Sequence, residues 1–231
     1  MSTRPDVAVI TGAGRGIGKA IALELARRGL DTVLLARTVE QIESTAAAVV
    51  ALGRRALALR CDVSQPHEVA RAAERALGEM GPPRVLVANA GVVRRALVHE
   101  TDDVAWDEVV GTNLKGVFLV TRAFLPAMLA AKRGRVIAIG SISSTIGTAK
   151  QSAYCAAKWG TVGFVKSLAE ELRGSGLQAM TVLPGSVDTT MLADSGFEAR
   201  MSPEHVAGVV AYAALEAPDA MNGSSVEVFG P

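Results

Sequence analysis

A tyrosine, a lysine and a serine in the second half of the chain have the residue types and spacing of an acid–base site. Tyr154 and Lys158 are four residues apart, and Ser141 stands thirteen residues before the tyrosine. On a helix, a four-residue gap places two side chains on one face, a turn apart. The lysine ammonium would then favour the phenolate and lower the tyrosine pKa from its usual value of about 10. Such a tyrosine can exchange a proton with a carbonyl or an alcohol, and the serine hydroxyl can hold the same oxygen.

The same spacing also arises when a lysine stem simply packs over an aromatic ring. The functional interpretation therefore depends on the elements that would position these residues. Short apolar runs alternate with longer helical stretches along the whole chain, which is typical of a parallel sheet covered by helices on both faces. Strands are expected at 7–10, 32–35, 56–59, 85–87, 135–139, 178–183 and 225–229. Helices are expected from the turn 12–18 to about 28, from the second strand to about 52, and at 66–77, 102–131, 152–172 and 203–215.

Two features bear on how these elements are connected. Glycines interrupt the expected helix 102–131 at Gly111 and Gly116, and Pro126 is expected to mark a second break. No linker, repeat or low-complexity segment divides the chain, so we expect one domain over residues 1–231.

Composition excludes several classes of protein. Lys and Arg number 24 against 23 Asp and Glu, so the net charge of +1 indicates neither a nucleic-acid nor a membrane surface. No run of about 18 apolar residues is present, and the N-terminus has no signal-peptide pattern. Cys61 and Cys155 have no metal-ligand spacing, and a disulfide framework is not expected. We therefore expect a cytoplasmic protein without a metal.

A glycine-rich turn follows the first expected strand. Residues 11–18 read TGAGRGIG and lie between that strand and the first expected helix. Glycines allow a tight turn and let the backbone come close to a pyrophosphate, which the positive end of the helix then stabilises. A plain glycine-rich loop is the alternative, but the flanking strand and helix favour nucleotide binding.

The end of the second strand indicates which dinucleotide would bind. An acidic residue there would bind the adenosine ribose and disfavour a 2′-phosphate. This chain has Ala36 and Arg37 instead, and Arg15 lies inside the glycine turn. Both arginines can bind a phosphate, although both could also be solvated surface charges. The missing carboxylate favours NADP(H).

Taken together, the ordered motifs resemble the short-chain dehydrogenase/reductase family over essentially the whole chain. The matching motifs are Thr11-Gly12-x-x-x-Gly16-x-Gly18, Asp62, Asn89-Ala90-Gly91, Asn113, Ser141, Tyr154-x-x-x-Lys158 and Pro184-Gly185. The resemblance implies a Rossmann-type α/β fold, with a doubly wound sheet of seven parallel strands and the cofactor across its switch point. It also implies a homotetramer or homodimer that pairs through the helices around 102–131 and 152–173.

The resemblance assigns roles to individual residues. The expected catalytic residues are Asn113, Ser141, Tyr154 and Lys158, with Asn113 holding a water chain that reaches the lysine. The residues expected along the cofactor are Gly12, Gly14, Arg15, Gly16, Ile17, Gly18, Arg37, Asp62, Val63, Asn89, Ala90, Gly91, Tyr154, Lys158, Pro184, Gly185, Val187 and Thr189. In isolation, Asp62 could instead cap the helix that follows it, Asn113 could be a polar residue at a helix break, and Pro184-Gly185 could be only a turn.

Residues at one end of the expected cavity indicate the class of substrate. Ser141, Ile146, Gln151 and Tyr154 are expected to contact it, and Thr145, Gly147, Thr148 and residues 92–94 are expected at the edge of its pocket. Most of these are small or apolar, which indicates a hydrophobic ketone. The chain most resembles the 3-ketoacyl-acyl-carrier-protein reductases. Lys132 and Arg133 match a basic patch that can face the carrier protein in such enzymes, whereas Ser175 stands where they often have a further basic residue.

The sequence therefore predicts NADPH-dependent reduction of a ketone to an alcohol, with Tyr154 as general acid. The substrate would be a 3-ketoacyl thioester, with an acyl carrier protein as a candidate partner, or a small hydrophobic ketone or diketone. Two alternatives remain open. One is an NAD-dependent alcohol dehydrogenase of the same family, and the other is a non-catalytic nucleotide-sensing protein on the same fold.

Overall fold

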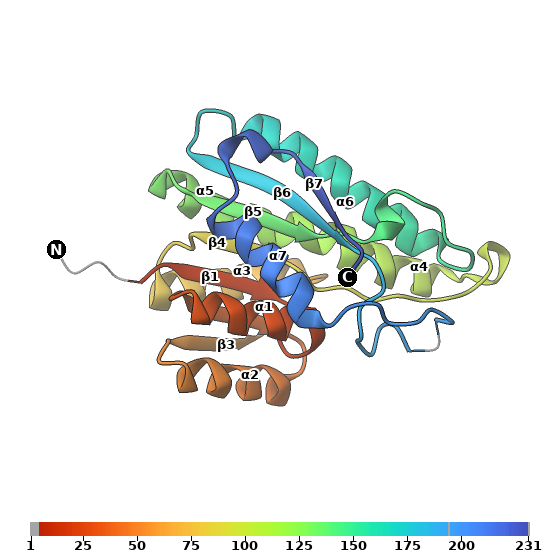
Figure 1. Ribbon diagram of the computed structural model, residues 1–231, viewed down its shortest axis with the longest axis horizontal. Helices are drawn as coiled ribbons and strands as arrows, with labels where there is room; N and C mark the ends of the chain where they lie inside the picture. The colour runs from red at the N-terminus through yellow and green to blue at the C-terminus, as the bar shows by residue number, and fades with distance from the viewer. Residues whose placement is uncertain (1–4, 194, 231) are drawn as a thin grey trace.

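A parallel sheet of seven strands forms the centre of the protein (Figure 1). The computed structural model describes residues 5–193 and 195–230. The order across the sheet is β3-β2-β1-β4-β5-β6-β7, so the chain winds outward from the centre first in one direction and then in the other. The strands are β1 (Val7–Thr11), β2 (Asp31–Ala36), β3 (Ala56–Arg60), β4 (Val85–Ala88), β5 (Gly134–Ile139), β6 (Leu177–Pro184) and β7 (Ser225–Val228). The expected doubly wound α/β fold is thereby confirmed.

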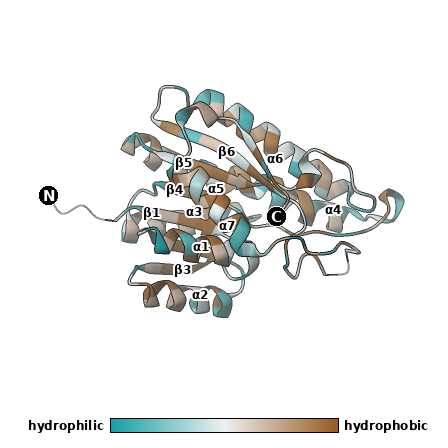
Figure 2. Cartoon of the chain, viewed as in Figure 1, coloured by the Kyte–Doolittle hydropathy of each residue, from teal (hydrophilic) through white to brown (hydrophobic). Residues whose placement is uncertain are grey.

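Helices cover both faces of the sheet, because its strands are apolar on both sides (Figure 2). The α-helices are α1 (Gly16–Arg27), α2 (Val39–Ala51), α3 (Pro66–Met80), α4 (Asp103–Val110), α5 (Gly116–Ala131), α6 (Ser152–Glu171) and α7 (Pro203–Leu215). One hydrophobic core joins the sheet to α1 and α7, and a second joins it to α3, α5 and α6. The fully buried Ile21 lies in the first core and Phe124 in the second.

The stretch between α4 and α5 does not break at its glycines but forms a π-helical turn, Gly111–Lys115. A second break at Pro126 was predicted, and this prediction is wrong because α5 continues through the proline to Ala131. A proline inside a helix removes one backbone hydrogen bond. Burial of Phe124 and Met128 against the sheet on either side of Pro126 offsets that loss.

The stretch Asp103–Ala131 is also long and apolar enough to cross a membrane, with a mean hydropathy of 1.5 in its most apolar window. Length and composition are weak evidence for such a span, because the core helix of a globular domain passes the same test. Here α5 packs on β4, β5 and α3, which is the position of a core helix.

The order of the strands determines where a site can form. β1 is paired with β2 on one side and with β4 on the other, so the connections from β1 and β4 leave toward opposite faces of the sheet. In open α/β sheets, the crevice outside the carboxyl ends of such strands is where ligands bind.

Candidate active site

A cavity of about 800 Å³ opens at the carboxyl ends of the strands, next to the point where the strand order reverses. The structure places all eighteen residues that the sequence assigned to the cofactor along its wall. Ser141, Ile146 and Gln151, assigned to the substrate, line the same space. Residues from the first and the last third of the chain therefore meet around one continuous cavity.

The glycine turn leaves its backbone open toward this cavity. Gly12 and Gly16 have positive φ angles of 65° and 51°, which side chains rarely tolerate. A Cβ on Gly18 would lie 2.2 Å from the carbonyl oxygen of Gly12, so the first turn of α1 can approach β1 only with glycine there. Arg15, at the N-cap of α1, makes no capping bond with its side chain, and the first turn contains no acidic residue. The positive end of the α1 dipole is thus available to an anion.

Gly18→Ala is expected to destabilise the folded protein by about 1–3 kcal/mol, because backbone must move to relieve the contact with Gly12. Gly78→Ala is the matched control, since Gly78 lies in α3 and a Cβ there meets nothing within 4 Å. Urea denaturation of both variants checks this. Equal stability of the two would contradict the close approach seen at Gly18.

Thr11 and Asn89 tie the glycine turn to the end of β4. The Thr11 hydroxyl accepts hydrogen bonds from the backbone N–H groups of Asn89 and Ala90, both at 2.9 Å. The Asn89 side-chain amide donates to the carbonyl oxygen of Thr11 at 2.9 Å and to that of Gly12 at 3.4 Å. We call these contacts the Thr11–Asn89 clamp. The sequence assigned Asn89 to the cofactor, and the structure shows that its amide holds the glycine turn.

Asp62 orders the loop after β3. Its carboxylate accepts hydrogen bonds from the backbone N–H and the hydroxyl of Ser64, at 2.9 and 2.8 Å. The residue is not the N-cap of α3, because Gln65 occupies that position. Asp62 also lines the cavity, which the alternative interpretation as a helix cap does not explain.

Arg15 and Arg37 lie on the cavity wall, together with Ala36 at the end of β2. Neither arginine forms an ion pair with a residue in the described ranges, so both guanidinium groups are available. Gln41 was not foreseen from the sequence. It packs so close to Gly14 that a Cβ on that glycine would lie 2.8 Å from the Cβ of Gln41.

Asn113 sits in the π-helical turn and lies behind the cavity wall, not on it. Its side-chain amide donates to the carbonyl oxygens of Val92 and Val109, both at 2.8 Å, while its backbone carbonyl accepts from the Thr161 hydroxyl at 3.0 Å. Its side-chain oxygen is buried and has no hydrogen-bond partner among the described residues. A Cβ on Gly91 would come within 2.7 Å of that oxygen, so this glycine makes room for Asn113.

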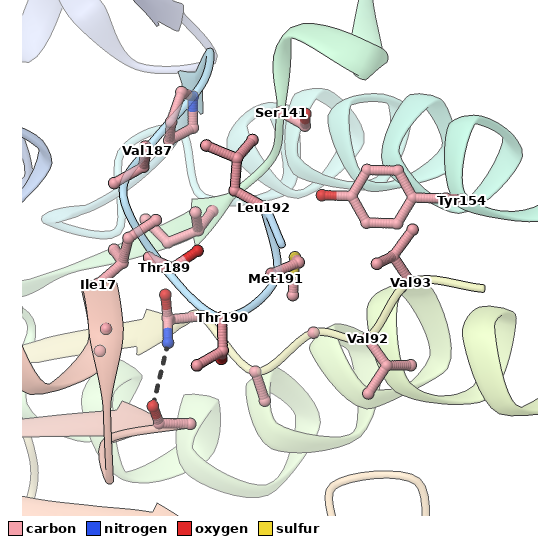
Figure 3. A pocket seen from close by; sticks show the side chains of 18 of the residues that line it. Ile17, Val92, Val93, Ser141, Tyr154, Val187, Thr189, Thr190, Met191 and Leu192 are labelled. Atoms are coloured by element: carbon pink, nitrogen blue, oxygen red, sulfur yellow. Dashed lines mark hydrogen bonds between the residues drawn. The ribbon is translucent and has the colours of Figure 1, made fainter. Parts of the chain in front are cut away.

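Tyr154 points into the substrate end of the cavity (Figure 3). It lies in the first turn of α6, and the Ser141 side chain borders the same space. The Ser141 oxygen also accepts a hydrogen bond from the backbone N–H of Ser143 at 3.1 Å, which fixes the serine rotamer. A carbonyl group entering this end therefore meets a phenol and an orientated hydroxyl.

Lys158 lies on the same face of α6 as Tyr154, as the four-residue spacing predicts, but its charge is directed elsewhere. Its Nζ donates to the carbonyl oxygen of Ile139 at 2.7 Å and lies 5.7 Å from the centroid of the tyrosine ring. Burial lowers the pKa of Lys158 from its usual 10.5 to about 8.

Burial also raises the pKa of Tyr154, and the neighbouring Ser141 hydroxyl acts in the opposite direction. The prediction that Lys158 lowers the tyrosine pKa is therefore wrong for this structure. The physical reason is that loss of hydration outweighs the other influences on the phenol. Tyr154 is a neutral phenol at neutral pH, which is the form that can donate a proton.

The substrate end is mainly apolar. Met191, Leu192 and Val93 border the space in front of Tyr154 (Figure 3). The prediction that Thr145 and Gly147 edge the pocket is wrong, because only Ile146 and Thr148 of residues 145–148 line the wall. The sequence also did not indicate Arg95, which lines the same end. Adjacent arginines in a loop look alike in a sequence, and only the fold distinguishes them.

Comparisons with known proteins agree with this arrangement. A model described as short chain dehydrogenase matches residues 6–199. The chain is 36% identical to a 3-oxoacyl-acyl-carrier-protein reductase of Pseudomonas aeruginosa over 242 aligned positions, which cover 100% of this chain and 98% of the relative. It is 34% identical to the corresponding Escherichia coli reductase over 243 positions, with the same two coverages.

Solved structures give the same result. A metagenomic short-chain oxidoreductase in complex with NADP is similar with a TM-score of 0.87 and 40% identity, over 98% of this chain and 97% of the other. A short-chain type dehydrogenase/reductase from Mycobacterium marinum is similar with a TM-score of 0.91 and 30% identity, over 97% and 94% of the two chains.

Proposed function

The chain belongs to the short-chain dehydrogenase/reductase family, and on this basis we propose that it is an NADPH-dependent enzyme that reduces a ketone to an alcohol. The observation that carries the proposal is the neutral Tyr154 phenol beside Ser141, in a cavity that also contains the open glycine turn. The relatives named above as 3-oxoacyl-acyl-carrier-protein reductases and the neighbour in complex with NADP support the reaction and the cofactor.

The donors along the cavity fit a phosphorylated dinucleotide. The uncapped N-terminus of α1 and the glycine turn would hold the pyrophosphate, and Asp62 and Val63 would lie beside the adenine. Arg15 and Arg37 would bind a 2′-phosphate, because both are free of carboxylate partners among the described residues. When bound, the nicotinamide supplies the hydride, and the protein supplies orientation and protons.

Tyr154 delivers the proton to the substrate oxygen. Reduction of a ketone requires an acid that is protonated at working pH, and a raised phenol pKa meets this requirement. Ser141 hydrogen-bonds the same oxygen and so positions it against the phenol. The apolar side chains of Val93, Met191 and Leu192 keep water away from this end.

Lys158 supports the reaction from the cavity wall, and Asn113 supports it from behind the wall. Lys158 can hold the hydroxyls of the nicotinamide ribose, and its pKa of about 8 leaves it mostly protonated near neutral pH. The unpartnered side-chain oxygen of Asn113 can accept a hydrogen bond from a water that resupplies protons toward the lysine.

The substrate we propose is a 3-ketoacyl thioester or a small hydrophobic ketone or diketone. Oxidation of NADPH by the purified protein, followed at saturating ketone with an acetoacetyl thioester, a diketone and an aryl ketone, tests this. Turnover with none of them at normal NADPH affinity would favour a sensor role, and faster turnover with NADH would favour the dehydrogenase alternative.

Arg37→Ala is expected to raise the dissociation constant for NADPH about 10- to 100-fold, because a charge-assisted hydrogen bond to the 2′-phosphate is lost. The dissociation constant for NADH, which lacks that phosphate, should change less than about twofold. Quenching of protein fluorescence by each nucleotide measures both. Equal weakening for the two nucleotides would assign Arg37 a role outside phosphate recognition.

We further propose that the protein is cytoplasmic and assembles as a homotetramer or homodimer. Exposed aromatic and aliphatic side chains support pairing through α4, α5 and α6, since Trp106, Phe118, Leu129 and Trp159 are 39–53% exposed. Sedimentation velocity tests the assembly.

An acyl carrier protein is a candidate partner through Lys132 at the end of α5, although Arg133 is engaged by Asp6.

A further inference from the structure

Arg95 brings a positive charge into the apolar end of the cavity. It lies in the loop after β4 and is half-buried. One terminal nitrogen, Nη2, donates to the carbonyl oxygen of Met191 at 2.9 Å. Its Nε–H group is buried and has no hydrogen-bond partner among the described residues. A guanidinium with unmet donors in such surroundings is costly unless something else accepts from it.

The adjacent Arg94 shows what a surface arginine of this loop does. Its guanidinium pairs with the carboxylate of Glu108 at 2.7 Å, and its side chain is 53% exposed. No carboxylate in the described ranges pairs with Arg95. Both arginines line the cavity, but Arg94 is neutralised by Glu108, whereas Arg95 has no carboxylate partner in the described ranges.

Arg95 is close enough to the reacting end to influence it. Burial dominates the pKa of Tyr154 and raises it, and the positive charge of Arg95 is one of the smaller influences, acting to lower it. Lys158 is turned toward the backbone of β5, where its ammonium donates to the carbonyl oxygen of Ile139. Arg95 is therefore the arginine of this loop whose charge is left for a substrate in the cavity.

We propose that Arg95 determines substrate specificity by binding a second oxygen acceptor on the substrate, a carbonyl or a carboxylate. The enzyme would then prefer dicarbonyl compounds and oxo acids to simple ketones. A guanidinium matches such oxygens with its planar fork of donors. A simple ketone would leave those donors unpaired, and sites with buried polar groups discriminate strongly against ligands that lack the partner. This inference rests on the proposed function and specifies its substrate class.

The bond to Met191 suggests a competing role, in which Arg95 only holds the segment after β6 in place. That role would affect every substrate alike, because the same wall surrounds all of them. A specificity role instead changes the ratio between two ketones that differ only in the second oxygen. A pair of matched substrates therefore separates the two roles.

The experiment compares pentane-2,4-dione with pentan-2-one, and includes acetoacetate as the anionic member. It uses the wild type, Arg95→Met, Arg95→Lys and the control Arg75→Met, at an exposed site of α3 that does not line the cavity. We expect Arg95→Met to lower the kcat/KM ratio of diketone to monoketone at least tenfold, mainly through KM. Arg95→Lys should recover part of the ratio, and Arg75→Met should leave it unchanged. If Arg95→Met loses more kcat/KM with acetoacetate than with the dione, Arg95 binds a carboxylate. If it loses more with the dione, Arg95 binds a carbonyl.

Equal loss for both ketones in Arg95→Met, or an unchanged ratio, would overturn the specificity role while leaving ketone reduction intact. The affinity for acetoacetate gives a second test that does not depend on turnover. Calorimetric titration of acetoacetate into the protein saturated with NADP+ should show a dissociation constant at least tenfold higher for Arg95→Met than for the wild type. Equal affinities would also overturn the inference, whereas a wild type that binds acetoacetate but reduces no ketone would contradict only the proposed function.

Discussion

Tyr154→Phe should lower kcat for ketone reduction about a hundredfold to ten-thousandfold, which is the contribution typical of a positioned general acid. The substitution removes one hydroxyl and keeps the ring that packs in the first turn of α6. Affinity for NADPH should therefore change little. Single-turnover oxidation of bound NADPH in the presence of saturating ketone isolates the step that the phenol serves.

The chain offers a matched control for this substitution. Tyr212 is the second of its two tyrosines, lies in α7 and is 43% exposed, away from the cavity. Tyr212→Phe should leave turnover unchanged. Turnover of Tyr154→Phe within a few-fold of the wild type would remove Tyr154 from the role of acid, even if Tyr212→Phe behaves as expected.

Lys158→Met should lower activity at least a hundredfold and yet make the cofactor-free protein more stable. Lys158 is 3% exposed, and its pKa in the folded protein is about 8 instead of its usual 10.5. The interval between these values corresponds to about 3 kcal/mol of unfavourable burial of the charged form. Removing the charge should raise the free energy of unfolding at pH 7 by about 1–3 kcal/mol. The gain is smaller than the full burial cost because the hydrogen bond to Ile139 is also lost.

The shifted pKa of Lys158 also predicts how the stability of the wild type changes with pH. Between pH 8 and 10.5 the unfolded chain keeps the Lys158 proton that the folded protein has released. Stability of the wild type therefore gains from this group as the pH rises through that interval, and the gain should be absent in Lys158→Met. Urea denaturation at pH 7 and pH 10 measures it. Lys166→Met, at an exposed site of the same helix, should retain the wild-type dependence.

The sequence predicted the fold and the membership of the cavity wall well, and the reason is physical. Alternation of apolar strands with helices and the glycine pattern depend on local backbone geometry, which neighbouring residues determine. The residues at the carboxyl ends of β1, β4 and β6 then lie close together, because the strands are parallel and these ends share one edge of the sheet. Helix ends shifted by a few residues, as at α3, which continues to Met80.

Electrostatics and individual side-chain directions could not be obtained in this way. The four-residue spacing of Tyr154 and Lys158 predicted that they share a helix face. It did not predict that the ammonium would donate to the carbonyl of Ile139. The sign of the tyrosine pKa shift follows from burial, which depends on elements far away in sequence. Arg94 and Arg95 differ only through Glu108 and Met191, which belong to other segments.

The Thr11–Asn89 clamp has a consequence for the order of folding. It joins the ends of two strands that lie 78 residues apart in the chain, so the glycine turn reaches its final shape only after β4 has joined β1. A nascent or partly unfolded chain without that pairing would lack the pyrophosphate cradle. The dinucleotide would then bind only to chains in which the sheet is complete. By mass action, the cofactor present in the cell would increase the free energy of unfolding. At a hundred times the dissociation constant, this adds about 2.7 kcal/mol to the folded state.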